Sequence, residues 1–196
     1  MSNADSEPPA ILSRVADLLS GYGRPWLLCG GWAVDAWLGR RTRDHLDVDI
    51  AVFQDDQAVL FDYLAGWSLV GHDPNVADDT TEPWNGRRLD LPAHVHANHP
   101  EMGGVELDIQ LNERVGPDWV LAPGLTVPLT GDRAWGLPVA LPEAVLFYKA
   151  GERIRAHDEH DFRALAPTLP AERRAWLRAA IERRHPRHPW SGRLGV

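Results

Sequence analysis

Apolar residues recur along the first half of the chain with two different periods. Helical spacing over residues 10–19, ended by two glycines, predicts an amphipathic first helix. A short apolar run at 26–29, bounded by proline and glycine, predicts a strand. The same rules predict helices at 32–38 and 58–64 and strands at 47–52 and 67–70. Helices and strands therefore alternate, which is typical of an α/β or α+β protein.

The middle of the chain changes from an irregular stretch to strands. Residues 72–92 contain three prolines, one glycine and many acidic residues, which predicts a long, partly irregular surface segment. Strict alternation of apolar and polar residues over 105–111 predicts a strand with one buried face. Two short runs, 119–121 and 125–129, are separated by Ala-Pro-Gly and predict a hairpin.

Helical patterns dominate after Pro142. They cover residues 144–150, 158–166 and 171–184, with prolines and glycines between them. The boundary falls near 136–142, so we expect a sheet-bearing domain over 1–138 and a helical C-terminal region over 139–196 packed on it. The predicted fold class is α+β, with a mixed sheet flanked by helices and followed by a small helical part.

Composition is that of an ordinary globular protein. The chain has 196 residues, 44% of them hydrophobic, enough for a core. No apolar stretch approaches the roughly 20 residues that span a bilayer, and the polar, acidic N-terminus lacks the pattern of a secretory signal. These features predict a cytoplasmic location. Cys29 is the only cysteine, and its apolar neighbours predict a buried, reduced thiol.

Charge restricts the class of partner. The net charge of −8 disfavours a long polyanion such as nucleic acid and suits a small cationic acceptor. Acidic residues gather in the segment 73–90, where they would attract a polycation, and basic residues gather near the C-terminus. The acidic residues are Asp73, Asp78, Asp79, Glu82 and Asp90, and the basic ones Arg173, Arg174, Arg178, Arg183 and Arg184. Solvated surface is the simpler interpretation of both groups.

Two short motifs suggest phosphate and metal chemistry. Gly30 and Gly31 stand between a predicted strand and helix, where a backbone without side chains can approach a ligand closely and helix N–H groups can face phosphate. Asp47 and Asp49 project from one face of the next strand, where carboxylate oxygens can hold Mg²⁺ against substrate phosphates. Either motif alone is weak, whereas the two in this order and context are much more specific.

The stretch from Gly30 to Val52 resembles the nucleotidyltransferase superfamily that includes DNA polymerase β. Within it, the order Gly-Gly-Trp, Asp, Leu-Gly-Arg, Thr-Arg, His and Asp-Val-Asp is most similar to the aminoglycoside 2''-adenylyltransferase and lincosamide nucleotidyltransferase group. The resemblance implies a mixed sheet, Gly30 and Gly31 against a triphosphate, and Asp47 and Asp49 as ligands of Mg²⁺. One departure is Trp32, which stands where other superfamily members place a small residue near the phosphates.

The resemblance also implies a third carboxylate on a neighbouring strand, which holds a metal or takes the proton of the attacking hydroxyl. Asp108 is our candidate because its predicted strand fits beside that of Asp47. Three like charges there would need a metal to be ionised together. Glu106 shares the same face and is the alternative, and a merely solvent-facing Asp108 is the simpler interpretation.

Two basic residues are candidates for contacting the nucleotide. Arg43 has forked donors suited to phosphate, or it forms a structural ion pair with Asp44 or Asp35. Lys149 is the only lysine in the chain and stands in an otherwise apolar helix, where related enzymes often place a nucleotide contact.

Histidine pairs and a tryptophan have simpler explanations beside functional ones. His94 and His96 at i and i+2, and the group His157, His160 and Asp161, could mimic metal sites, but no cysteine or HExxH motif supports either. The second group, followed by Phe162, resembles a helix-packing segment of related enzymes. Trp84 lies in the acidic segment and is the tryptophan that we would test for stacking on an acceptor.

The predicted function is transfer of AMP from ATP, with two Mg²⁺ ions, to a hydroxyl of a small molecule such as an aminoglycoside. A second hypothesis is a toxin-like nucleotidyltransferase acting on tRNA or protein, docked through the C-terminal arginines. A third is a nucleotide-binding module without turnover.

Overall fold

A mixed β-sheet forms the centre of the protein. The computed structural model describes residues 7–72, 83–129 and 133–195. Within those residues seven strands form one sheet in the order β1-β2-β5-β4-β3, with β6 paired to β5 and β7 to β6. The strands are β1 (Leu27–Leu28), β2 (Asp47–Phe53), β3 (Ser68–His72), β4 (Ala93–Asn98), β5 (Glu106–Val115), β6 (Asp118–Ala122) and β7 (Leu125–Pro128). Among these strands of the described residues, β2 and β5 pair in parallel and the other pairs are antiparallel.

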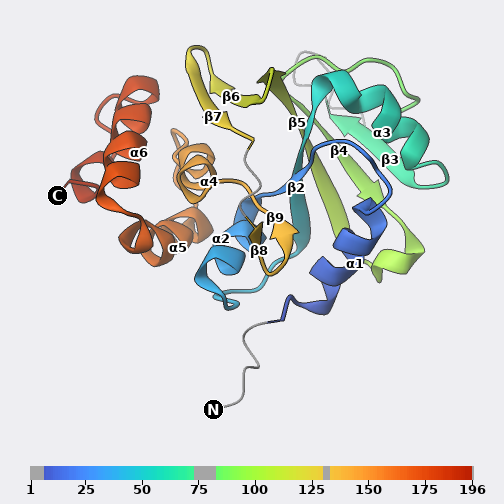
Figure 1. Ribbon diagram of the computed structural model, residues 1–196, viewed down its shortest axis with the longest axis horizontal. Helices are drawn as coiled ribbons and strands as arrows, with labels where there is room; N and C mark the ends of the chain where they lie inside the picture. The colour runs from blue at the N-terminus through green and yellow to red at the C-terminus, as the bar shows by residue number, and fades with distance from the viewer. Residues whose placement is uncertain (1–6, 73–82, 130–132, 196) are drawn as a thin grey trace.

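Alternation along β2 and β5 gives the sheet one apolar and one polar face. Val48, Ile50, Leu107 and Ile109 are fully buried, whereas the aspartates between them point to the opposite side. Helices α1 (Ala10–Leu19) and α3 (Gln57–Tyr63) lie on one side of the sheet (Figure 1). Burial of this apolar face fixes the strand register, because a slip by one residue would turn the aspartates into the core.

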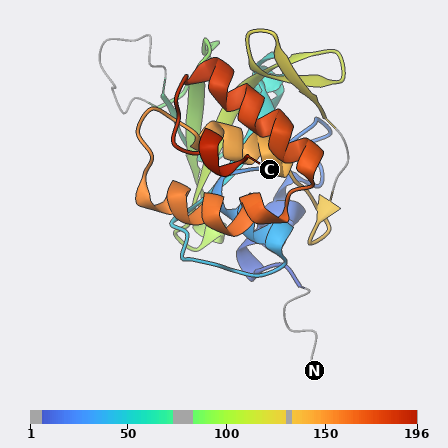
Figure 2. The ribbon, with the colours of Figure 1, turned by 90° about the vertical axis from the view of Figure 1, so that its left-hand side faces the viewer.

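The remaining helices lie on the other side. These are α2 (Gly30–Leu38), α4 (Pro142–Lys149), α5 (Ala156–Leu165) and α6 (Ala171–Arg184). Figure 2 shows α4, α5 and α6 as a layer in front of the sheet. Helix α4 packs against α2, α5 and α6, and Ala140 N–H donates to Leu28 O at 2.9 Å, so the C-terminal region is joined directly to the sheet. A two-stranded hairpin, β8 (Arg133–Ala134) and β9 (Leu137–Pro138), precedes this layer.

The α+β fold expected from the sequence is confirmed, with differences in particular elements. The first helix and the helix over 171–184 begin and end as predicted. Helix α2 starts at Gly30, two residues before the prediction, so both glycines belong to its first turn. Strands β4 and β8–β9 were not predicted. In the described part of the chain, no helix is both long and apolar enough to span a membrane.

Trp84 is not available for acceptor stacking, and that prediction is wrong. Its side chain is 4% exposed and packs edge-on against Phe61, with ring centroids 5.2 Å apart. The indole N–H donates to Arg87 O at 2.7 Å, and the backbone N–H of Trp84 donates to Leu69 O on β3. The segment after residue 82 therefore folds back on β3 and α3. Asp73, Asp78, Asp79 and Glu82 of the acidic segment lie outside the described residues.

Candidate active site

The two glycines are required by what packs against them. Gly30 has φ of +62°, and a Cβ atom there would lie 1.7 Å from Asp49 Oδ2. A Cβ atom on Gly31 would lie 2.2 Å from Arg43 Nη2 and 2.6 Å from the ring of His45. The start of α2 thus sits directly against the side chains of Asp49, Arg43 and His45, which would have to move to make room for a Cβ atom.

Three carboxylates meet beside this turn. The parallel register of β2 and β5 places Asp49 opposite Asp108 and Asp47 opposite Glu106. Carboxylate oxygens of Asp47, Asp49 and Asp108 all lie within 4.8 Å of one another. Glu106 contacts other groups: its Oε2 accepts from Asn98 at 2.9 Å and its Oε1 lies 3.5 Å from His96 Nδ1. The structure therefore brings together Asp108, rather than Glu106, with the first two aspartates.

Burial and mutual repulsion raise the pKa values of two of these acids. Burial, reinforced by the charges of Asp49, Asp47 and Glu106, raises the pKa of Asp108 to about 7. Burial and the charge of Asp47 likewise raise the pKa of Asp49. Oδ1 of Asp108 is buried without a hydrogen-bond partner among the described residues. A half-buried set of oxygen donors with excess negative charge and an unsatisfied oxygen fits a divalent cation such as Mg²⁺.

The loop between α2 and β2 is held by a buried carboxylate. Asp35 is fully buried; it accepts from Thr42 Oγ1 and N–H and lies 2.6 Å from His45 Nε2. His45 in turn packs on Trp32, with ring centroids 4.2 Å apart, and the Trp32 indole donates to Asp47 O at 3.0 Å. Trp32 therefore supports the backbone of the first aspartate, and its indole N–H is used for that contact.

Arg43 and Lys149 meet at one buried acid. Arg43 donates to both oxygens of Asp161 on α5, at 2.9 and 3.0 Å. Lys149 Nζ lies 2.8 Å from Asp161 and 3.4 Å from Asp158, and its side chain is 8% exposed. The structural partner of Arg43 is thus Asp161, and not Asp44 or Asp35 as considered from the sequence; the Asp44 contact is only to the backbone oxygen. A partner 118 residues away is invisible to local sequence patterns.

Basic side chains around Asp161 and Asp158 offset the effect of burial on the pKa values of these two acids. Burial acting alone would raise the pKa of Asp161, but the hydrogen bond from Arg43 and the charge of Lys149 hold that pKa below its ordinary value. Asp158 behaves alike: its pKa is lowered because Arg155 and Lys149 outweigh its burial. The two carboxylates are therefore ionised and join α5 to α4 and to the loop before β2.

A cavity of about 590 Å³ opens over the carboxylates. Its lining includes every site residue predicted from the sequence, namely Gly30, Gly31, Arg43, Asp47, Asp49, Asp108 and Lys149. A neighbouring cavity of about 1030 Å³ shares Gln110, Asn112 and Tyr148 with the first and reaches the histidines of β3 and β4. The site is therefore a two-part cleft between the polar face of the sheet and the C-terminal helices.

Sequence reasoning missed the aromatic wall of this cleft. Trp119 stacks on Tyr148, with ring centroids 5.5 Å apart and planes at 25°. The Trp119 indole donates to Asn112 Oδ1 at 3.1 Å, so β5, β6 and α4 meet here. Arg155 and His157 at the start of α5 also line the first cavity. The available signal is Tyr148, which has a polar hydroxyl and stands next to Lys149 at the end of an otherwise apolar helix.

Other candidates have structural roles. Cys29 is a half-buried thiol whose pKa is raised by burial and by Asp49 and Asp108, so it stays protonated. Phe162 stacks on Trp190 with centroids 4.2 Å apart, as expected of a helix-packing segment. His160 is exposed on α5, whereas Asp161 beside it is the buried partner of Arg43.

Comparison with known proteins gives matches of two kinds. The family model described as Aminoglycoside-2''-adenylyltransferase matches residues 11–165. Among solved structures, ANT(2")-Ia in complex with adenylyl-2"-tobramycin aligns with a TM-score of 0.60 and 22% identity, covering 89% of this chain and 97% of that one. The lincosamide antibiotic adenylyltransferase LnuA, bound to lincomycin, aligns with a TM-score of 0.57 and 20% identity, covering 83% and 99%. No curated protein matches the chain.

Proposed function

The chain belongs to the aminoglycoside-2''-adenylyltransferase family, and from this premise we propose that it transfers AMP from ATP to a hydroxyl of a small antibiotic-like acceptor. The family makes the protein a nucleotidyltransferase. The observation that carries the specific proposal is the convergence of Asp47, Asp49 and Asp108 within 4.8 Å beside the Gly30-Gly31 turn. Phosphoryl chemistry needs charge neutralisation and positioning more than covalent catalysis, and this geometry supports both.

Asp47, Asp49 and Asp108 are the proposed ligands of two Mg²⁺ ions. When bound, the ions would neutralise charge on the attacking and leaving oxygens of an in-line displacement at the α-phosphorus. Trp32 keeps Asp47 in place through its backbone oxygen, and Gly30 gives Asp49 the space that it occupies. The cost of holding three half-buried, mutually repelling carboxylates together is the reason to expect that they bind a divalent metal.

Asp108 is the proposed general base. Strand β5 lies between β2 and β4, so among the three aspartates Asp108 is on the side of the second cavity. An acceptor there would present its hydroxyl to Asp108, while the α-phosphorus lies over Asp47 and Asp49. Without metal, burial and the neighbouring carboxylates raise the pKa of Asp108 to about 7. Bound Mg²⁺ would lower that pKa again, so the role as general base rests on the position of Asp108 and not on this value.

The triphosphate is expected at the start of α2. The nine-residue helix offers unpaired N–H groups of its first turn, and Gly30 and Gly31 let a phosphate approach them. Arg43 and Lys149 line the same cavity and add positive charge, although their nearest donors are engaged by Asp161. We therefore propose that both act on the nucleotide mainly through charge.

The second cavity is the proposed acceptor site. The two similar solved structures contain an adenylylated tobramycin and a lincomycin, both small hydroxyl-bearing antibiotics. A cationic acceptor also suits the net charge of −8.

Mass spectrometry tests the proposed transfer reaction. The purified protein is incubated with Mg²⁺, each nucleoside triphosphate and panels of aminoglycosides and lincosamides. We expect an AMP adduct of a small molecule. Labelling of total RNA or of a protein instead, with no small-molecule product, would overturn the proposal.

The macromolecular alternative has little support in the structure. Arg178 is paired with Glu182 at 2.9 Å, Arg173 contacts Glu143 at 3.4 Å, and Arg174 donates to Leu169 O. These arginines serve the packing and surface of α6.

The hypothesis of a nucleotide-binding module without catalytic turnover is also disfavoured, because such a module would have no need for three mutually repelling carboxylates.

A further inference from the structure

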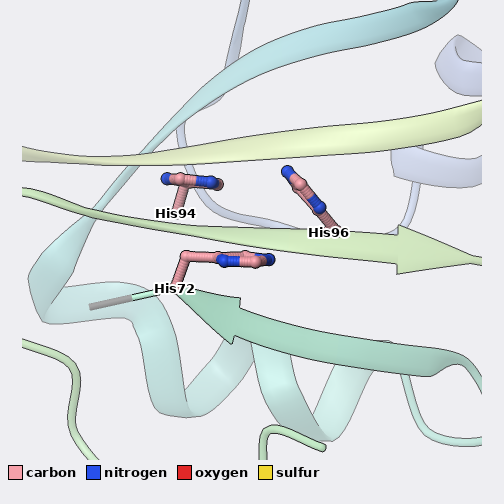
Figure 3. A group of neighbouring side chains, drawn as sticks. All are labelled: His72, His94 and His96. Atoms are coloured by element: carbon pink, nitrogen blue, oxygen red, sulfur yellow. The ribbon is translucent and has the colours of Figure 1, made fainter. Parts of the chain in front are cut away.

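Three histidines form a cluster next to the carboxylates but outside their set. His72 ends β3, and His94 and His96 lie on β4, where the antiparallel register places His94 opposite His72. Ring nitrogens from all three lie within 4.8 Å of one another. Figure 3 shows the rings of His72 and His94 nearly edge-on, one above the other, with His96 beside them. Two distant segments thus bring three imidazoles to one place on the polar face of the sheet.

The spacing of the rings suits a metal ion. Ring centroids are 4.7 Å apart for His72 and His94, 4.3 Å for His72 and His96, and 4.9 Å for His94 and His96. Imidazole nitrogens about 2.0–2.1 Å from a tetrahedral zinc ion are roughly 3.3 Å from one another. The rings of His72 and His94 are stacked with their planes at 10°, so at least one of them must turn before nitrogens of all three rings face one ion.

Acidic groups stand behind the cluster. His96 Nδ1 lies 3.5 Å from Glu106 Oε1, and His96 Nε2 lies 3.9 Å from Asp108 Oδ1. Whichever nitrogen of His96 faces an ion, the other has a carboxylate near it. Histidine ligands of metals usually donate a hydrogen bond to a carboxylate through the other ring nitrogen, and Glu106 is the nearer candidate for that role here. The nearby negative charge also favours a cation over an anion at this position.

We propose that His72, His94 and His96 bind one transition-metal ion of the Zn²⁺ class. All three line the second cavity, so an ion held by three imidazoles would keep a fourth position open toward it. Imidazole ligands select Zn²⁺, Cu²⁺ or Ni²⁺, whereas carboxylates suit Mg²⁺. The cleft would then hold two chemically different metal sites, and the histidine site would lie in the wall of the cavity that we propose for the acceptor. The inference does not depend on the proposed transfer reaction.

Zn²⁺ titration by calorimetry tests the proposal, with excess Mg²⁺ present to occupy the carboxylates. We expect the wild-type protein to bind about one Zn²⁺ at the cluster, and His94→Ala and His72→Asn each to weaken binding about tenfold or more. His160→Ala, at an exposed histidine of α5, should change the affinity less than twofold. Asp47→Asn with Asp49→Asn should also retain Zn²⁺ binding.

Thermal unfolding gives a second readout that also checks folding. At a concentration about a hundredfold above Kd, Zn²⁺ should raise the Tm of the wild type by roughly 5–10 °C. The histidine variants should unfold cooperatively but lack this rise. Unchanged Zn²⁺ affinity in both histidine variants, or loss of Zn²⁺ binding in the double aspartate variant alone, would overturn the proposal.

Discussion

At the scale of single residues, the site depends on space that side chains do not fill. Gly30 and Gly31 are conformationally permissive, but their more stringent role is to leave room for Asp49, Arg43 and His45. A methyl group at either position would displace a functional side chain. The sequence motif predicted a phosphate contact here, and the structure adds that the glycines also fit the carboxylate strand against α2.

Gly30→Ala should greatly reduce the rate of transfer while the protein stays folded. The added Cβ would lie 1.7 Å from Asp49 Oδ2, and the φ of +62° is strained for alanine by about 1 kcal/mol or more. We expect kcat/KM to fall about 100-fold or more in steady-state assays. Gly192→Ala is the matched control, because nothing lies within 4 Å of its Cβ position. Equal loss in both variants would argue against the steric explanation.

Asp108 should make the metal-free protein less stable as pH rises. Its pKa is about 7 in the folded state against an ordinary value of 3.8, so the folded protein holds the proton more tightly. Stability is therefore lost between about pH 4 and pH 7 as that proton leaves. Above pH 7 and without metal, we expect Asp108→Asn to have a higher Tm than wild type by about 3 °C or more. A wild-type Tm that rises over this range, and a variant that melts no later, would contradict this.

At the scale of elements, α5 is joined to the sheet region by charge. Asp161 is fully buried between Arg43 and Lys149, so its removal leaves two partly buried cations without their main partner. Sequence patterns gave the helix itself but not this role, because periodicity reports which face of a helix is apolar and not which distant charge it meets.

Asp161→Asn should cost about 3 kcal/mol in the free energy of unfolding, measured with denaturant. The exposed pair Arg178 and Glu182, also on a C-terminal helix, supplies the comparison, and Glu182→Gln should cost less than about 0.5 kcal/mol. If both substitutions have the same small effect, the buried cluster does not join the elements as we describe.

The strands show what sequence could predict and what it could not. Alternation of apolar and polar residues, clear in most of β5 and at the start of β2, predicted both strands. The choice of Asp108 as third carboxylate also needed the family resemblance. β4 could not be predicted, because its alternation uses alanine and histidine in a segment with prolines and glycine on either side. His72 comes close to the histidines of β4 only because β3 pairs with β4. Trp84 is buried because it packs on Phe61 of α3. Neither contact can be predicted from a local sequence pattern.

At the scale of the molecule, the sheet and the C-terminal helices form the two walls of one cleft. We propose that residues 1–138 are the nucleotidyltransferase domain and 139–196 a region that is packed on it and is required for its stability. Val145, Leu146 and Phe147 are buried in the shared core, and Ala140 bonds to β1. A chain ending at residue 138 should therefore lack cooperative unfolding, as followed by circular dichroism. A sharp transition in that fragment would show that the domain is independent.

The most direct test of the account is adenylyl transfer by carboxylate variants. Asp47→Asn and Asp49→Asn should each lower product formation about 100-fold or more with Mg²⁺ and ATP, while far-UV circular dichroism stays that of the wild type. Asp62→Asn, at an exposed position of α3 on the opposite side of the sheet, should leave it unchanged. Wild-type rates in either site variant would contradict the claim that this carboxylate cluster performs the transfer.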